Sequence, residues 1–283
     1  MRPTARSLLL DLLSTVSRGS VPVRALVRSG ELFGIEPNAI RGALARLRAA
    51  QLVHSDQRGR YRLGERARAV HGQVASWRAR ERRTRPWDGG WLAVHTSPLG
   101  RSDRRALRRR MRALAFLGFR ALEPGLELRP DNLAEPTDGT RERLEALGLD
   151  AGALVCRLGG LDAARDARAR GLWDVDALCL GYRRRASELE SSAVRLAEQP
   201  RERAMVESFL LGGAALRQLA YDPLLPEELA APRERDRLVA VMRQYDRLGR
   251  RAWAGMLEVD GEHTPADLRA FEAVGALAQA RGV

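Results

Sequence analysis

Residues 36–63, with the sequence EPNAIRGALARLRAAQLVHSDQRGRYRL, join a helical pattern directly to a hairpin pattern. Pro37 suits the first turn of a helix, where its missing backbone N–H costs no hydrogen bond. Ile40, Leu44 and Leu47 recur at helical spacing and therefore form one apolar stripe. The segment also holds six arginines but only two acidic residues. A short helix with one buried side and one basic side is therefore predicted.

The side of this helix opposite the apolar stripe mixes arginine and asparagine with very small residues. Gly42 and Ala45 would let the helix backbone lie close to a surface, while the longer side chains beside them reach into it. In the major groove of DNA, arginine pairs with guanine and asparagine pairs with adenine. An ordinary solvated face would more often carry Glu and Gln beside its arginines. We therefore predict a DNA-contacting face that consists of Asn38, Arg41, Gly42, Ala45, Arg46 and Arg48, with Asn38, Arg41 and Arg46 reading bases.

The elements around this helix complete a recognisable order. Two helical patterns precede it, at residues 4–17 and 23–32, and two strand patterns follow it, at residues 52–54 and 60–63. Residues 56–59 supply the turn between the strands. Three helices followed by a two-stranded wing predict a winged helix-turn-helix. The wing arginines expected to touch phosphate or the minor groove are Arg58, Arg60 and Arg62.

The positive charge of the chain is concentrated in its first part. Residues 1–85 contain 18 Arg and 6 acidic residues, a net charge of +12. The rest of the chain contains 31 Arg and 30 acidic residues, a net charge of only +1. A basic segment joined to a near-neutral body is typical of a protein that binds a polyanion at one end. A solvated basic surface would carry the same charge, so the DNA interpretation depends on the order of elements as well.

Several other classes of protein fit the sequence poorly. The apolar run of residues 7–16 is interrupted by Asp11 and is too short for a membrane span, so no membrane partner is expected. Cys156 and Cys179 are the only cysteines and form no CxxC pair, which is typical of a reducing cytoplasm. The four histidines are scattered along the chain, so neither a metal site nor a bound cofactor is expected.

Segments along nearly the whole chain, in order, resemble the PaaX-like repressors of phenylacetic acid degradation. AIRGALARLRAAQLV and RGRYRL, within residues 39–63, are similar to that family's recognition helix and wing. RTRPWDGGWLAVHTS at residues 83–97 and RALRRRMRALAFLGFRALEPGLELRP at residues 105–130 resemble its central domain. GLWDVDALCLGYRRRASELE at residues 171–190 and LRQLAYDPLLPEEL at residues 216–229 resemble its C-terminal signatures.

This resemblance implies a ligand-responsive transcriptional regulator, most simply a homodimeric repressor of an aromatic-acid catabolic operon. Its partners would be double-stranded operator DNA, with a palindromic site, and a CoA thioester such as phenylacetyl-CoA that releases the DNA. The chain departs from the family pattern at AAPRERDRL, where a tryptophan-glycine step is usual, and at Tyr221, where arginine is common. These departures keep open a regulator of the same architecture that answers a different acyl-CoA or small acid.

The resemblance also implies a ferredoxin-like central domain, and the residues independently permit one. A sheet with helices on one side is the natural packing of a β–α–β–α–β order. The helix in this part carries seven arginines within residues 101–112, and whether it meets DNA, a CoA phosphate or only solvent stays open. The expected elements are a strand at residues 91–96, a helix at 101–117, a strand or hairpin at 119–128, a helix at 141–147 and a strand at 153–158.

The family's central domain is similar to the small CRISPR adaptation nucleases, so an enzymatic alternative has to be considered. Such a nuclease needs a carboxylate near the end of the first strand to hold a divalent metal ion. Here that strand ends in VHTSPLG, without Asp or Glu, and Asp88 precedes it beside a glycine. We expect Asp88 to serve the turn and the chain to have no catalytic residues, with a metal-dependent nuclease as the less favoured alternative.

The expected fold class is an α+β multidomain protein whose last part is helical. Long helical patterns occupy residues 175–197, 202–220 and 235–259. A ligand pocket between these helices and the central sheet fits the preference of such sites for domain junctions. The expected domains are residues 1–68 (winged helix-turn-helix), 69–85 (a basic linker helix), 86–172 (ferredoxin-like dimerisation and coupling) and 173–283 (helical and effector-linked). The candidate effector-binding residues are Arg105, Arg108, Arg109, Trp173, Tyr182 and Arg183, although large aromatics are more often core residues.

Overall fold

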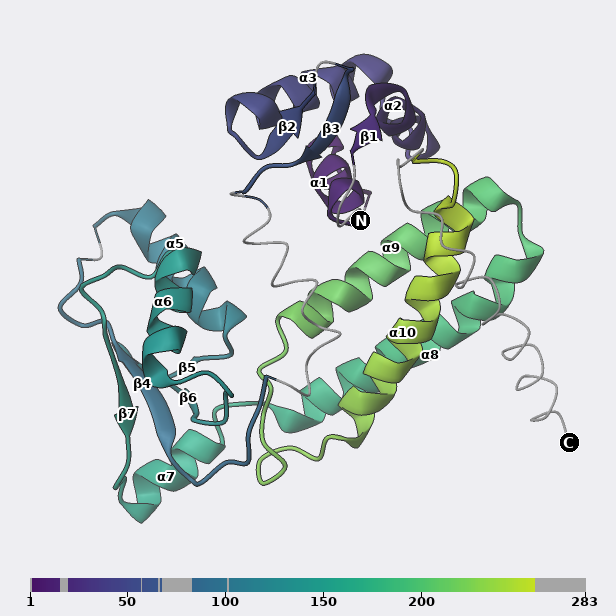
Figure 1. Ribbon diagram of the computed structural model, residues 1–283. Helices are drawn as coiled ribbons and strands as arrows, with labels where there is room; N and C mark the ends of the chain where they lie inside the picture. The colour runs from purple at the N-terminus through teal and green to yellow at the C-terminus, as the bar shows by residue number, and fades with distance from the viewer. Residues whose placement is uncertain are drawn as a thin grey trace, which may run out of the picture. The chain divides into compact units, whose positions relative to one another are not determined.

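The structure, a computed structural model, is mixed α+β as predicted, with two small sheets and a helical C-terminal part (Figure 1). It divides into two compact units, whose bodies are residues 3–65 and 66–253. The linker helix expected at residues 69–85 lies almost entirely outside the described residues, as does the chain after residue 257. The described residues are 2–15, 20–56, 58–65, 67, 83–100 and 102–257.

The first unit contains the three predicted helices and the predicted hairpin. Each helix turns its apolar residues inward, and α1 alone buries four leucines. The hairpin strands β2 and β3 are joined by a short strand β1, so the sheet is antiparallel in the order β1-β3-β2. The strand β1 is an addition to the prediction, because two residues are too few to show a strand pattern. The elements are α1 (Ala5–Thr15), β1 (Val21–Pro22), α2 (Val23–Leu32), α3 (Pro37–Ala49), β2 (Val53–Ser55) and β3 (Arg60–Leu63).

Two glycines shape the turn that joins α2 to α3. Gly34 has a φ of +70°, a left-handed conformation that an L side chain rarely adopts. Gly30 lies where the two helices meet, and a Cβ added there would be 2.6 Å from Cγ1 of Ile40. The two helices can therefore approach this closely only because residue 30 has no side chain.

Gly30→Ala is expected to lower the free energy of unfolding by about 1–3 kcal/mol, because the new methyl group would overlap Ile40 in a packed core. Gly42→Ala is the matched control, since a Cβ at this position would meet only Nη1 of Arg46, at 3.4 Å. In the control, the better helix propensity of alanine should leave stability equal or higher by up to about 1 kcal/mol. Urea denaturation of both variants measures the difference, and equal stability would contradict the packing argument.

The second unit begins with a four-stranded antiparallel sheet in the order β5-β6-β4-β7. Its βαββαβ chain order is that of a ferredoxin-like arrangement. The segment expected to be a strand or a hairpin is a hairpin, and its turn places Gly125 at a φ of +83°. The elements are β4 (Trp91–His95), α5 (Arg104–Phe116), β5 (Arg120–Glu123), β6 (Leu126–Pro130), α6 (Thr137–Leu147) and β7 (Leu154–Leu158).

Different elements cover the two faces of this sheet, because successive side chains of a strand point to opposite faces. Leu92 and Val94 of β4 belong to a buried cluster with residues of α5 and α6. Trp91 and Ala93 belong to another cluster, which includes Trp173 and Leu225. The second face is therefore buried by the C-terminal part of the chain.

Three long helices with a shared core follow the sheet. They are α8 (Val175–Glu198), α9 (Arg201–Ala220) and α10 (Arg233–Trp253), and a shorter helix, α7 (Ala163–Arg170), precedes them. Ser192 Oγ donates to Glu207 Oε1 at 2.7 Å and lies 2.8 Å from the hydroxyl of Tyr245. Burial raises the pKa of Tyr245 to about 12, so its hydroxyl stays protonated and can donate to Ser192.

The buried side chain of Arg129 joins the sheet to the loop after α9. Its Nη2 donates to the carbonyl of Pro223 at 3.3 Å and to Oδ1 of Asn132 at 3.0 Å, and its Nη1 donates to the carbonyl of Leu117. Asn132 Nδ2 in turn donates to the carbonyl of Leu224 at 2.7 Å. Burial lowers the pKa of Arg129 to about 9, which still leaves its guanidinium charged at neutral pH. A buried cation is thus held here by neutral oxygens of three different segments.

Candidate nucleic-acid interface

Helix α3 turns its apolar stripe inward and its basic side outward. Ile40, Leu44 and Leu47 are buried, and so is Ala43. The six residues predicted to contact DNA occupy the other side of the helix. Asn38, Arg41, Ala45, Arg46 and Arg48 are exposed, and Gly42 is half-buried.

Side chains on this exposed side are arranged in neighbouring pairs. Arg41 Nη1 donates to Oδ1 of Asn38 at 3.2 Å, which holds two potential base readers side by side. Nη1 of Arg46 lies 3.4 Å from the position that a Cβ on Gly42 would take. The small residue therefore leaves room for an arginine to fold across the helix surface.

Asp56 shapes the tip of the wing between β2 and β3. Its Oδ1 accepts the backbone N–H groups of Arg58 and Arg60, both at 2.9 Å. Gly59 completes the turn with a φ of +68°. Arg58 is exposed at this turn and Arg62 is exposed on β3, so the wing presents two cationic side chains.

Arg60 differs from the other two wing arginines because the first unit uses its guanidinium internally. The side chain is half-buried, and its Nε donates to Oγ of Ser20 at 3.0 Å. Its Nη2 donates to the backbone carbonyl of Ser20 at 2.6 Å. Arg60 therefore ties β3 to the residue that precedes β1, in addition to any contact with phosphate.

The six candidate effector residues lie in three separate places within the second unit. Arg105, Arg108 and Arg109 are exposed on α5, and Arg183 is exposed on α8. Trp173 is only 5% exposed and lies under the sheet, where its ring stacks on Trp91 at a centroid distance of 6.3 Å. Tyr182 is 6% exposed and belongs to the shared core of α8, α9 and α10. These residues are not brought together into one pocket.

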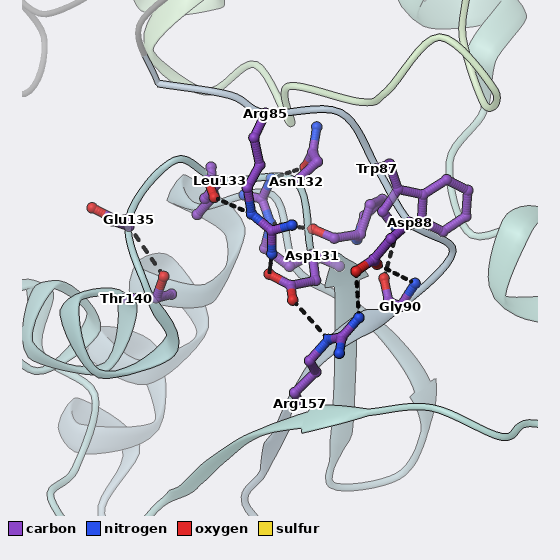
Figure 2. Close-up of polar contacts among 12 residues, drawn as sticks. Arg85, Trp87, Asp88, Gly90, Asp131, Asn132, Leu133, Glu135, Thr140 and Arg157 are labelled. Carbon is purple, nitrogen blue, oxygen red and sulfur yellow. Dashed lines mark hydrogen bonds and ion pairs between the residues drawn. The ribbon is translucent and has the colours of Figure 1, made fainter.

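Figure 2 shows a cluster of ion pairs in the second unit. Residues of this cluster help to line a hollow of about 510 Å³. Buried Asp131 forms ion pairs with two arginines: its Oδ1 lies 2.9 Å from Arg85 Nη2, and its Oδ2 lies 3.0 Å from Arg157 Nε. Arg157 Nη2 also lies 2.5 Å from Oδ2 of Asp88. Asp88 Oδ1 accepts the backbone N–H of Gly90 at 3.0 Å, and this bond, together with Arg157, lowers the pKa of Asp88. Asp88 serves the turn, as predicted from the sequence.

Neither a metal-binding cluster nor a membrane-spanning helix is found in the described parts of the chain. Within them, no group of three or more His, Cys, Asp or Glu side chains is placed to hold a metal ion. None of the helices described here combines the length and the apolar character needed to cross a lipid bilayer.

Comparisons with known proteins address the fold and the first unit. A solved structure described as "Uncharacterized protein Rv0674 from Mycobacterium tuberculosis" is similar, with a TM-score of 0.58. The match covers 88% of this chain and 98% of that chain at 23% sequence identity, a level that shows likeness of fold alone. A search among curated proteins found no match.

The family model described as "PaaX-like protein" matches residues 4–67, which hold the three helices and the wing of the first unit. The PaaX-like family is one of transcriptional regulators, so the match suggests that this chain regulates transcription. Over residues 4–67, the predicted resemblance to the PaaX-like family is confirmed.

Proposed function

We propose that this protein is a transcriptional regulator that reads its DNA operator with α3. The observation that supports the proposal best is the exposed side of α3, where Asn38 and Arg41 lie within hydrogen-bonding distance inside the segment that matches the PaaX-like family. Arginine can donate two hydrogen bonds to the major-groove edge of guanine, and asparagine can make a bidentate contact with adenine. Gly42 and Ala45 would let the helix enter the groove deeply.

The wing would hold the protein on the duplex without reading sequence. Arg58 is exposed at the turn whose backbone bonds to Asp56, and Arg62 is exposed on β3, which suits contact with phosphate or the minor groove. Arg60 is included in this set, although its guanidinium also bonds to Ser20.

The proposal extends to control by a ligand, which rests on the family resemblance. The protein would be a cytoplasmic homodimeric repressor on a palindromic operator, released by phenylacetyl-CoA or a related acyl-CoA. Both cysteines are free thiols, which supports a reducing compartment. For release to occur, ligand and operator must favour different states of the dimer, and each must then weaken the binding of the other by the same factor.

Footprinting on the DNA upstream of the protein's own gene tests the proposal. We expect protection of two half-sites about 10–10.5 bp apart, which is the spacing of adjacent major grooves on one side of the duplex. Addition of the effector should remove the protection, and a panel of acyl-CoAs and aromatic acids identifies the effector. Protection that never exceeds that of unrelated DNA would reject the proposal.

Arg62→Ala is expected to weaken binding to all duplexes by a similar factor and to reduce the slope of log affinity against log salt by about 1, as for the loss of one phosphate contact. Titration of the operator and of a scrambled duplex at several salt concentrations measures both effects. Arg60→Ala is the comparison, since it should also lower thermal stability through the loss of the Ser20 contacts. If Arg62→Ala affected the operator alone, the wing would have to read bases.

A further inference from the structure

We propose that α5 carries a second DNA-binding surface, which holds the sugar-phosphate backbone of duplex DNA outside the base pairs that α3 reads. This inference rests on the proposed function and extends it to the second unit. The surface consists of exposed arginines on one side of α5 and is named here the basic stripe. Its members are Arg104, Arg105, Arg108, Arg109 and Arg112.

The positions of the five arginines place them on one side of α5. Arg104, Arg108 and Arg112 follow one another at intervals of four residues, and Arg105 and Arg109 form a parallel row beside them. A rise of 1.5 Å per residue makes the stripe roughly 12 Å long. The other side of the helix is buried, so the arginines cannot turn inward.

Arg110 shows what a structural arginine looks like on the same helix. It is only 3% exposed, and its Nε lies 2.8 Å from Oδ2 of Asp150. Within the described parts of the chain, none of the five stripe arginines has such an acidic partner. Within the described residues, the stripe is therefore a concentration of positive charge without a salt bridge.

The two carboxylates that adjoin α5 are engaged elsewhere. Asp103 caps the helix, where its Oδ1 accepts the backbone N–H groups of Arg105 and Ala106 at 2.7 and 3.1 Å. These bonds lower the pKa of Asp103 and keep it ionised on the backbone. Asp150 is paired with Arg110. Both carboxylates lie close enough for Arg109 to help lower their pKa, but within the described residues neither forms a salt bridge with a stripe arginine.

An extended polyanion fits the stripe better than a small phosphate ester does. Pockets for small ligands are concave, with donors that converge on one point, whereas these side chains project from the exposed side of a helix. The hollow beside Asp131 is lined by none of them. Duplex DNA carries one negative charge per roughly 1.7 Å of its axis when both strands are counted, so a length of roughly 12 Å holds about seven phosphate charges. Two parallel rows of arginines can therefore contact several successive phosphates of the backbone.

The test compares the full-length protein with two variants that each lose five positive charges. In the stripe variant, R104Q/R105Q/R108Q/R109Q/R112Q, the charges come from α5 alone. In the scattered variant, R168Q/R203Q/R217Q/R233Q/R247Q, they come from exposed positions on α7, α9 and α10. Fluorescence anisotropy measures affinity at several salt concentrations for two duplexes. One duplex holds only the operator, and the other adds flanking sequence on both sides.

We expect the wild-type protein to bind the flanked duplex more tightly than the short one. The stripe variant should lose this advantage, and its slope of log affinity against log salt on the flanked duplex should fall by up to about 4.5, because about 0.9 is lost per phosphate contact. The scattered variant should keep most of the tighter binding to the flanked duplex and most of the salt slope. Discrimination between operator and scrambled sequence on the short duplex should stay unchanged in all three proteins.

Several results would overturn the inference. It is wrong if the stripe variant keeps the wild-type slope and flank advantage, or if both variants lose them equally. If the wild-type protein bound the flanked duplex no more tightly than the short operator, the inference would be rejected and the proposed function would stand. If it bound no duplex at all, both would be rejected. The smaller change R104Q/R108Q/R112Q should give an intermediate slope, and it decides the question if the stripe variant fails to fold.

Discussion

Replacement of both Asn38 and Arg41 with alanine is expected to cost roughly 2–6 kcal/mol of operator-binding free energy, since each bidentate base contact contributes about 1–3 kcal/mol. Both side chains are exposed on α3, so the change removes contacts to DNA without opening the core. The two residues are hydrogen-bonded to each other at 3.2 Å, and their single losses should therefore not simply add. Titration of a labelled operator with the double variant and both single variants measures these quantities.

Sequence discrimination separates base reading from charge in this experiment. On a scrambled duplex the double variant should lose much less affinity than on the operator, because phosphate contacts by the wing remain. Arg168→Ala, on the exposed surface of α7, is the control and should bind both duplexes like the wild-type protein. An equal loss on the operator and the scrambled duplex would show that the α3 pair contacts only the backbone of DNA.

Arg129→Met is expected to lower the free energy of unfolding by about 3–5 kcal/mol, because each buried acceptor that loses its donor costs about 1–3 kcal/mol. Methionine fills a similar length of space but donates no hydrogen bond. The buried carbonyls of Leu117 and Pro223 would each lose a donor, and Asn132 would lose the partner of its Oδ1. Urea denaturation measures the difference. The stability of Arg129→Lys should lie between those of the wild-type protein and Arg129→Met, because lysine keeps the charge with a different donor geometry.

A matched arginine on the surface controls for the loss of charge alone. Arg183→Met removes an exposed guanidinium from α8, and such substitutions usually change stability by no more than about 0.5 kcal/mol. Wild-type stability in Arg129→Met would mean that the carbonyls find other donors, and the link between sheet and loop would then depend on apolar packing alone.

Periodicity predicted the helices of the first unit well, because each has one buried face with regular spacing. Ile40, Leu44 and Leu47 lie in the core for this reason, and the exposed residues of α3 follow from the same wheel. The internal bonds of Arg60 could not be predicted in this way. Its partner, Ser20, lies 40 positions away, and strand alternation describes the face of a residue but not its polar partner.

The polar clusters of the second unit were equally hidden from the sequence. Arg85, Asp131 and Arg157 are far apart in the chain and meet only after the sheet has formed. The two aromatic candidates for the effector site illustrate the same limit. Trp173 and Tyr182 are close in sequence but enter different cores, because one precedes α8 and the other lies on its inner face.

The way in which Arg129 and Asn132 hold the loop after α9 has a consequence for how the sequence can drift over time. Arg129 donates to the main-chain carbonyl of Pro223, and Asn132 donates to that of Leu224. Every amino acid supplies such a carbonyl. In homologues of this chain, Arg129 and Asn132 should therefore be conserved together, while the residues whose carbonyls they bond can be substituted. A lineage that discards one member should discard the other as well.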